Sequence, residues 1–127
     1  MGELALIEQI RRTFSSKDPT FHKKVALGIG DDCAILRPSA GHEILVTTDF
    51  SLENRHFLRG VHPPASIGHR CLARGLSDLA AMGATPLAAF LSLALPAEVL
   101  RTPKGRRWIE GFLGGLRSLA VAHKTTL

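Results

Sequence analysis

Apolar residues recur at helical spacing in three parts of the chain. The first part is short and runs from Glu3 to Arg12. The second begins near Ser66, a good N-cap, and runs to about Gly83, and the third runs from about Pro103 to His123. In each part the apolar side chains fall on one face, which predicts an amphipathic helix with one buried side. The expected buried side chains are Ile67, Cys71, Leu72, Leu76, Leu79 and Ala80 in the second helix and Trp108, Ile109, Phe112, Leu113, Leu116 and Leu119 in the third.

Four shorter apolar runs are predicted to be strands. They are Val25–Ile29, Cys33–Leu36, Glu43–Asp49 and Leu87–Leu95. Glu43–Asp49 has the clearest strand character, because it is rich in β-branched residues and ends on a carboxylate. The last run could also be a buried helical segment, but its short length between two prolines favours a strand. The order helix, three strands, helix, strand, helix predicts a mixed α+β domain.

The segments between these runs are predicted to be loops. Ser15–Lys24 is polar and basic with one proline, and Phe50–Pro64 has little periodicity. Thr125–Leu127 follows the last helix and has the character of a strand that begins there, which would need a partner. We therefore expect residues 1–127 to form one domain, and we expect that domain to be part of a longer protein.

Composition narrows the class of protein. Of the 127 residues, 45% are hydrophobic, which suits a packed core and argues against disorder. No apolar run is long enough to cross a bilayer, and the first residues lack the features of a signal peptide. Cys33 and Cys71 lie outside any paired-cysteine pattern. Reduced thiols, a cytoplasmic location and no membrane partner are therefore expected.

The formal net charge of +5 favours a polyanionic partner, either nucleic acid or a phosphorylated small molecule. The basic residues are scattered, and no zinc finger, aromatic RNA platform or basic heptad array accompanies them. The Lys104–Arg107 cluster falls at the start of a predicted helix, where the helix dipole disfavours it, so it is interpreted as a solvated face. We therefore expect no nucleic-acid partner.

Aspartates mark the ends of predicted elements. Asp31 and Asp32 follow one strand, Asp49 ends another, and Asp78 lies within a helix. Carboxylates that share a crevice suit a hard cation such as magnesium, which takes oxygen ligands and binds phosphates beside them. Gly28 and Gly30 would let the backbone turn tightly and approach a phosphate. Each aspartate also has a plain structural interpretation, since Gly-Asp-Asp is an ordinary turn sequence and Asp49 could simply end a strand.

Two familiar nucleotide motifs are excluded. The dinucleotide-binding fingerprint needs a third glycine where Cys33 stands, and it needs a helix where a strand is predicted. A Walker A sequence is missing as well, so a P-loop is ruled out. If the protein handles a nucleoside triphosphate, its site must have another architecture.

Three segments together resemble thiamine-monophosphate kinases. They are Gly28–Leu36, Thr47–Asp49 and Leu76–Ala84, which come in the order and at about the spacing of that family's N-terminal domain. The wider superfamily includes aminoimidazole ribonucleotide synthetase, and its members use ATP without a P-loop. The resemblance implies a mixed sheet with helices packed on one face, as in the aminoimidazole ribonucleotide synthetase-like N-terminal domain.

The resemblance also implies a reaction, in which ATP and thiamine monophosphate give ADP and thiamine diphosphate with magnesium. Asp31, Asp49 and Asp78 match the family's metal ligands, and Asp32 and Thr48 are plausible additional ligands. Gly30, Asp31, Asp32 and Thr48 are expected around the nucleotide. Metals and an in-line acceptor would carry phosphoryl transfer, so no catalytic side chain and no phosphoenzyme are expected.

His56 and Phe57 match the family's His-Phe pair, which implies contact with substrate. The chain departs from the family beside them, because Asn54 and Arg55 replace a Gly-Val pair. Gly75 stands where the family commonly carries asparagine. The family continues into a Gly-Gly-Asp motif and a second domain, which this sequence does not contain.

Other interpretations stay open beside the kinase. The chain could be a non-catalytic module that dimerises and binds nucleotide, or part of a superfamily enzyme with another substrate. The superfamily resemblance implies in either case that two such domains pair through their sheets, so a homodimer is expected.

Overall fold

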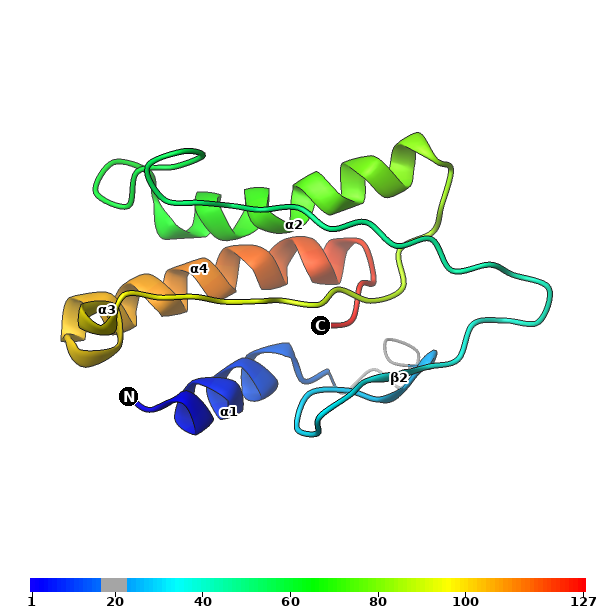
Figure 1. Cartoon of the computed structure of the whole chain (residues 1–127), viewed down its shortest axis with the longest axis horizontal. Coiled ribbons are helices and arrows are strands. Elements are labelled where there is room, and N and C mark those ends of the chain that lie inside the picture. The colour runs from blue at the N-terminus through cyan, green and yellow to red at the C-terminus, as the bar shows by residue number, and fades with distance from the viewer. Residues whose placement is uncertain (17–22) are drawn as a thin grey trace.

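The computed structural model describes residues 1–16 and 23–127 (Figure 1). Most of the predicted loop Ser15–Lys24 therefore lies outside the described residues. The α+β class is confirmed, with helices and a small antiparallel sheet of two strands. The described elements are α1 (Glu3–Phe14), β1 (Val25–Leu27), β2 (Ile35–Leu36), α2 (Pro64–Ala81), α3 (Ala97–Arg101) and α4 (Pro103–Ala122).

Helices α2 and α4 lie side by side and form the centre of the molecule (Figure 1). Glycines allow this close approach, since a Cβ on Gly68 would meet the backbone of Phe112. In the same way, a Cβ on Gly115 would meet the backbone of Ala65, and one on Gly111 would lie 3.0 Å from Pro64 Cβ. The backbones of the two helices are thus in direct contact, and this contact fixes the position of α2 relative to α4.

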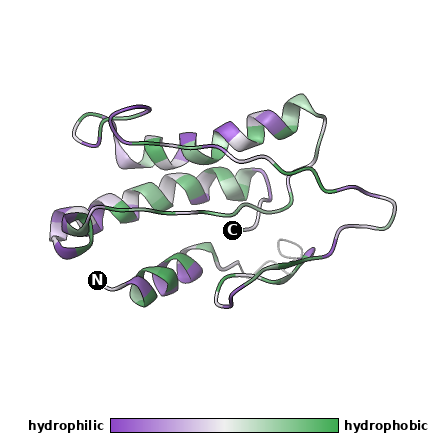
Figure 2. Ribbon diagram, in the orientation of Figure 1, coloured by the Kyte–Doolittle hydropathy of each residue, from purple (hydrophilic) through white to green (hydrophobic). Residues whose placement is uncertain are grey.

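The core gathers around α4. Ile109, Leu113 and Leu116 are almost fully buried there, and Ile67 and Leu72 of α2 pack against them. Figure 2 shows the green, hydrophobic side of each long helix alternating with a purple side. The predicted buried faces are confirmed in part, since half of the predicted side chains are buried. Cys71, Leu76, Leu79, Trp108 and Leu119 are only partly buried. Ala80 was predicted as buried and is exposed, because it lies in the last turn of α2, beyond the part of the helix that packs against α4. Phe14, Val99, Phe112 and Ala120 complete the buried core.

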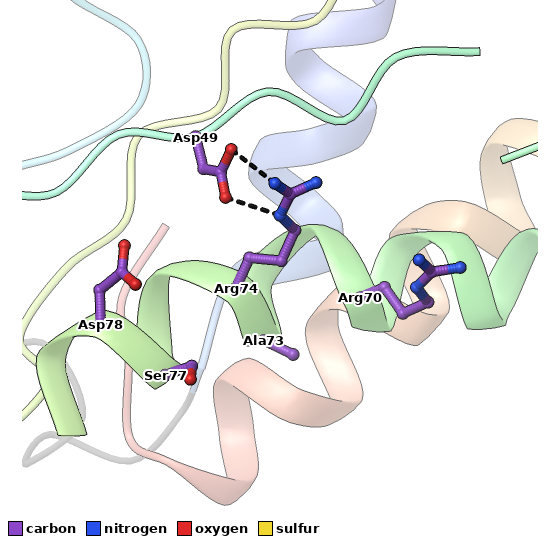
Figure 3. A pocket seen from close by; sticks show the side chains of 6 residues that line it. All are labelled: Asp49, Arg70, Ala73, Arg74, Ser77 and Asp78. Carbon is purple, nitrogen blue, oxygen red and sulfur yellow. Dashed lines mark hydrogen bonds and ion pairs between the residues drawn. The ribbon is translucent and has the colours of Figure 1, made fainter. Parts of the chain in front are cut away.

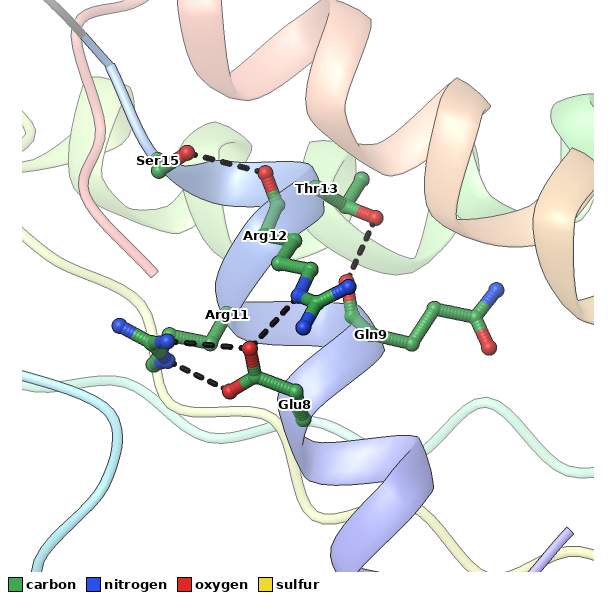
Figure 4. A network of polar contacts seen from close by, with 6 residues as sticks. All are labelled: Glu8, Gln9, Arg11, Arg12, Thr13 and Ser15. Atoms are coloured by element: carbon green, nitrogen blue, oxygen red, sulfur yellow. Dashed lines mark hydrogen bonds and ion pairs between the residues drawn. The ribbon is translucent and has the colours of Figure 1, made fainter.

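Helix α1 confirms the first predicted helix and extends two residues beyond it. Its exposed side carries a polar network in which Glu8 accepts hydrogen bonds from both Arg11 and Arg12 (Figure 4). These bonds, the one from Arg11 above all, lower the pKa of Glu8 to about 2. Arg117 of α4 donates to the Thr13 carbonyl at 2.7 Å, which ties α1 to the central helices.

Two of the predicted strands, Glu43–Asp49 and Leu87–Leu95, do not join the described sheet. The β1–β2 hairpin forms where expected, but Glu43–Asp49 has no backbone partner within the described residues. Its high β propensity specifies an extended chain, whereas a strand also needs a neighbouring edge. The segment instead runs along α2 with most of its side chains exposed (Figure 1).

Leu87–Leu95 is likewise an extended segment rather than a full strand. Its single bridge joins Ala88 to Thr126 in parallel, with Ala89 N–H donating to the Thr126 carbonyl at 2.7 Å. Burial alternates along it, with Leu91, Leu93 and Leu95 packed against the core and Phe90 73% exposed. The alternation of a strand is thus present, but within the described residues its backbone pairs only at the Thr126 end.

Helix ends account for the remaining differences. Ser66 is wrong as the N-cap of α2, because the cap is Pro63 and Pro64 occupies the first turn with a preset φ. The short helix α3 was not predicted. Thr102 caps α4 by accepting from the Gly105 N–H at 3.1 Å. Among the described residues, no helix is long and apolar enough to cross a membrane.

Candidate functional site

A shallow depression lies between α2 and the extended segment that ends at Asp49 (Figure 3). Its volume is about 350 Å³. Asp49 and Asp78, two of the predicted metal ligands, both line it. The other lining residues are Arg70, Ala73, Arg74 and Ser77.

The periodicities of the two elements bring these side chains together. Positions 70, 74 and 78 are four residues apart on α2, so they follow one face of the helix. Thr47 and Asp49 are two residues apart on the extended segment, and both contact α2. Thr47 Oγ1 donates to Asp78 Oδ2 at 2.6 Å. The depression therefore joins segments 31 residues apart in sequence.

Asp49 is engaged by Arg74 in a two-point ion pair. Arg74 Nε lies 2.6 Å from Asp49 Oδ2, and Arg74 Nη2 lies 2.9 Å from Asp49 Oδ1. Arg74 Nη1 also donates to the Phe50 carbonyl at 3.0 Å. One guanidinium thus neutralises the carboxylate and holds the adjoining backbone against α2.

The oxygen atoms of the depression suit a hard cation. Two carboxylates and the hydroxyls of Thr47 and Ser77 offer oxygen ligands only, and magnesium typically uses one or two carboxylates with phosphates and water. No group of three or more His, Cys, Asp or Glu side chains converges anywhere in residues 1–16 and 23–127. The donor chemistry therefore fits magnesium bound together with a phosphorylated ligand, and not a metal enclosed by protein alone.

Asp31 and Asp32 lie in the exposed turn between β1 and β2. Gly30 has a φ of 128°, which confirms the predicted tight turn at this glycine, whereas Gly28 has no positive φ. Asp31 Oδ1 accepts the Asp32 N–H at 2.8 Å, and neither residue lines the depression. Their assignment as ligands of the same metal stays a prediction.

Thr48 is exposed, and it is Thr47 whose hydroxyl contacts Asp78. The alternation of an extended chain could have shown this, because Thr47 shares the face of Asp49 and Thr48 points the other way. Thr48 as a ligand stays a prediction. Arg70, Arg74 and Ser77 were not predicted from the sequence.

The loop after Asp49 is a well-defined turn. Asn54 has a φ of 64°, in the left-handed region that glycine and asparagine tolerate best. Asparagine, which stands here in place of the family's glycine, is therefore a residue that suits this backbone conformation. His56 Nδ1 accepts the Leu52 N–H at 3.0 Å, which leaves Nε2 outside this bond.

Aromatic and ionic contacts dock this loop on the helices. Phe57 stacks on Trp108 with ring centroids 6.4 Å apart, so this predicted substrate contact also has a packing role. Arg59 bonds to Glu53 at 3.0 Å and to Glu98 of α3 at 3.3 Å. These contacts fix the conformation of the loop that carries His56 and Phe57. Substrate binding by these two residues stays a prediction.

Comparison with known proteins gives consistent results. The family model described as "AIR synthase related protein, N-terminal domain" matches residues 30–127. The chain is 38% identical over 127 residues to the thiamine-monophosphate kinase of Haemophilus influenzae, covering all of this chain and 35% of that protein. It is 46% identical over 87 residues to that of Synechococcus elongatus, covering 68% of this chain and 25% of that protein.

A solved structure is similar as well. The crystal structure of thiamine-monophosphate kinase from Stenotrophomonas maltophilia matches with a TM-score of 0.65 at 36% identity. The match covers 100% of this chain and 36% of that one. The chain thus spans at most about a third of the length of these relatives.

Proposed function

The chain belongs to the AIR synthase related family, as its N-terminal domain, and we propose that it forms part of a kinase that converts thiamine monophosphate to thiamine diphosphate with ATP. The resemblance to thiamine-monophosphate kinases that the sequence motifs gave is confirmed by the named relatives. Their names support a phosphotransferase that acts in thiamine diphosphate biosynthesis.

The convergence of Asp49 and Asp78 is the observation that carries this proposal. They come from segments far apart in the chain and line one depression with arginine side chains. A site of mixed carboxylate and guanidinium groups can bind a metal–phosphate complex, because each charge type finds its opposite in the ligand. We therefore propose that the phosphates of the nucleotide bind in this depression.

Magnesium is the metal that we propose. Asp49 and Asp78 would hold it, and bound magnesium would neutralise charge on the transferred phosphoryl group. The protein's own part is to orient Asp78 on helix α2, to hold Asp49 beside it on the extended segment, and to position the phosphates beside Arg70 and Arg74. We retain Asp31, Asp32 and Thr48 as proposed further ligands, and Gly30 as a backbone contact to the nucleotide.

We also propose that two copies of the domain associate. Val46 is 79% exposed, Phe50 is 74% exposed and Phe90 is 73% exposed, and all three lie on extended segments. Such exposed apolar side chains on extended, largely unpaired backbone favour pairing with another strand. Light scattering after size exclusion is expected to give twice the 13.7 kDa mass of one chain, and Phe50→Lys to reduce it to one chain.

We also propose that the protein is cytoplasmic. Both cysteines are free in the structure, which suits a reducing compartment. ATP and thiamine monophosphate are the proposed small-molecule partners.

A chimera tests the activity. The chain would replace the matching N-terminal third of the Stenotrophomonas maltophilia kinase, and thiamine diphosphate formation would be assayed with ATP and magnesium. We expect turnover in the chimera and its loss in an Asp49→Asn, Asp78→Asn double variant. Glu110→Gln, an exposed change on α4, is the matched control. A soluble, folded chimera that forms no thiamine diphosphate would contradict the proposal.

A further inference from the structure

The carboxylate of Asp49, a proposed magnesium ligand, is already occupied by a side chain of the same protein. Arg74 engages both of its oxygens with the planar fork that guanidinium groups use for carboxylates (Figure 3). A cation that approaches Asp49 must compete with this pair. Asp78 differs, because its carboxylate bonds to the neutral hydroxyl of Thr47 and to no cationic side chain of the described residues.

We propose that Arg74 is an internal counterion of Asp49 that a divalent cation must displace in order to bind this carboxylate. The inference rests on the proposed function, since it takes Asp49 to be a metal ligand. Arg74 is then a positioning residue, which keeps Asp49 fixed on α2 until the metal arrives.

The exposure of the pair makes such an exchange feasible. The side chains of Arg74 and Asp49 are 35% and 33% exposed, so water and ions can reach them. An ion pair at this depth is weaker than a buried one, because solvent screens it. Asp78 keeps an unneutralised charge in the same depression and would attract the cation first.

The released guanidinium would remain useful in the depression. It would lie one helical turn from Arg70, which has no polar partner within the described residues. Two cationic side chains would then face the phosphates that accompany the metal. Arg74 would thus exchange a carboxylate partner for a phosphate partner as the site is filled.

Manganese titration of the 127-residue chain tests this exchange without any activity assay. Free Mn²⁺ would be followed by electron paramagnetic resonance, with Mg²⁺ added as a competitor. Arg74→Gln removes the fork and its charge, whereas Arg74→Lys keeps the charge and loses the two-point geometry. Arg70→Gln is the matched control, because it removes a charge from the same depression without breaking an ion pair.

We expect Arg74→Gln to tighten Mn²⁺ binding about fivefold, which is the upper end of the effect of an ion pair that solvent screens. Arg74→Lys should tighten it about threefold, and Arg70→Gln less than that. In an Asp49→Asn background, Arg74→Gln should give no such gain.

Two results would overturn the proposal, and they can be told apart. If the wild-type chain binds Mn²⁺ and Arg74→Gln is no tighter than Arg70→Gln, Arg74 does not compete with the metal. If no variant binds Mn²⁺ at all, the metal assignment in the proposed function fails, and the exchange fails with it.

Discussion

Replacing Gly115 by alanine tests the backbone contact between α2 and α4. A Cβ at this position would lie 2.6 Å from the Ala65 carbonyl carbon and nearer still to its oxygen, whereas ordinary contact begins at 3.4 Å. Neither neighbour is a flexible side chain, so the helices themselves must move apart. Gly114, the adjacent residue, provides a matched control, because a Cβ there would have no neighbouring atom within 4 Å.

The expected magnitudes follow from these two environments. Alanine in place of glycine in a helix interior stabilises by about 1 kcal/mol, and Gly114→Ala should show this gain. Gly115→Ala has the same helix gain, but overpacking costs about 1–3 kcal/mol or more, because the core between the helices loses contact. We therefore expect Gly115→Ala to be less stable than Gly114→Ala by about 2 kcal/mol.

Urea unfolding followed by far-ultraviolet circular dichroism measures this difference. Thermal unfolding should show it as well, with Tm lower by roughly 6 °C or more in Gly115→Ala than in Gly114→Ala. Equal stability of the two variants, within about 0.5 kcal/mol, would refute the backbone contact as the reason for glycine at this position.

Three further predictions concern separate parts of the chain. Asn54→Val should destabilise by about 1–2 kcal/mol because a β-branched residue resists a left-handed φ, whereas Asn54→Gly should be neutral in the same urea assay. Burial raises the pKa of the Cys71 thiol, so iodoacetamide at about pH 8 should label exposed Cys33 first in mass spectra, and equal rates would contradict this. The pKa of Glu8 is lowered, so its contribution to stability is present above the unfolded value of 4.5 and is lost as pH falls toward about 2. Carbon NMR of Glu8 should titrate near pH 2, and Arg11→Gln should move the midpoint upward.

The long helices could be predicted from the sequence because their signals are local. The apolar spacing from Pro103 to His123 requires no knowledge of the rest of the chain, and α4 ends only one residue earlier than predicted. Glu43–Asp49 shows the opposite case. Its residues favour an extended backbone, but hydrogen-bonded pairing depends on a second edge that composition does not specify.

The candidate site, like the fold, could be predicted only in part. Asp49 and Asp78 were identified from motif resemblance, and the structure brings them into one depression. Arg74 could not be identified, since its partner lies 25 residues away and only tertiary packing reveals the pair. Thr47 could have been predicted, because side chains alternate along an extended chain and Thr47 therefore shares the face of Asp49.

Trp108 gives the protein an optical probe of its own loop. It is the only tryptophan in the chain, and its ring stacks on Phe57, in the loop after Asp49, and on Phe112 of α4. Its indole Nε1 is buried without a hydrogen-bond partner among the described residues, so its emission depends on what surrounds the ring. A ligand that shifts the turn changes this stack and is therefore detectable by intrinsic fluorescence, without a label and in real time.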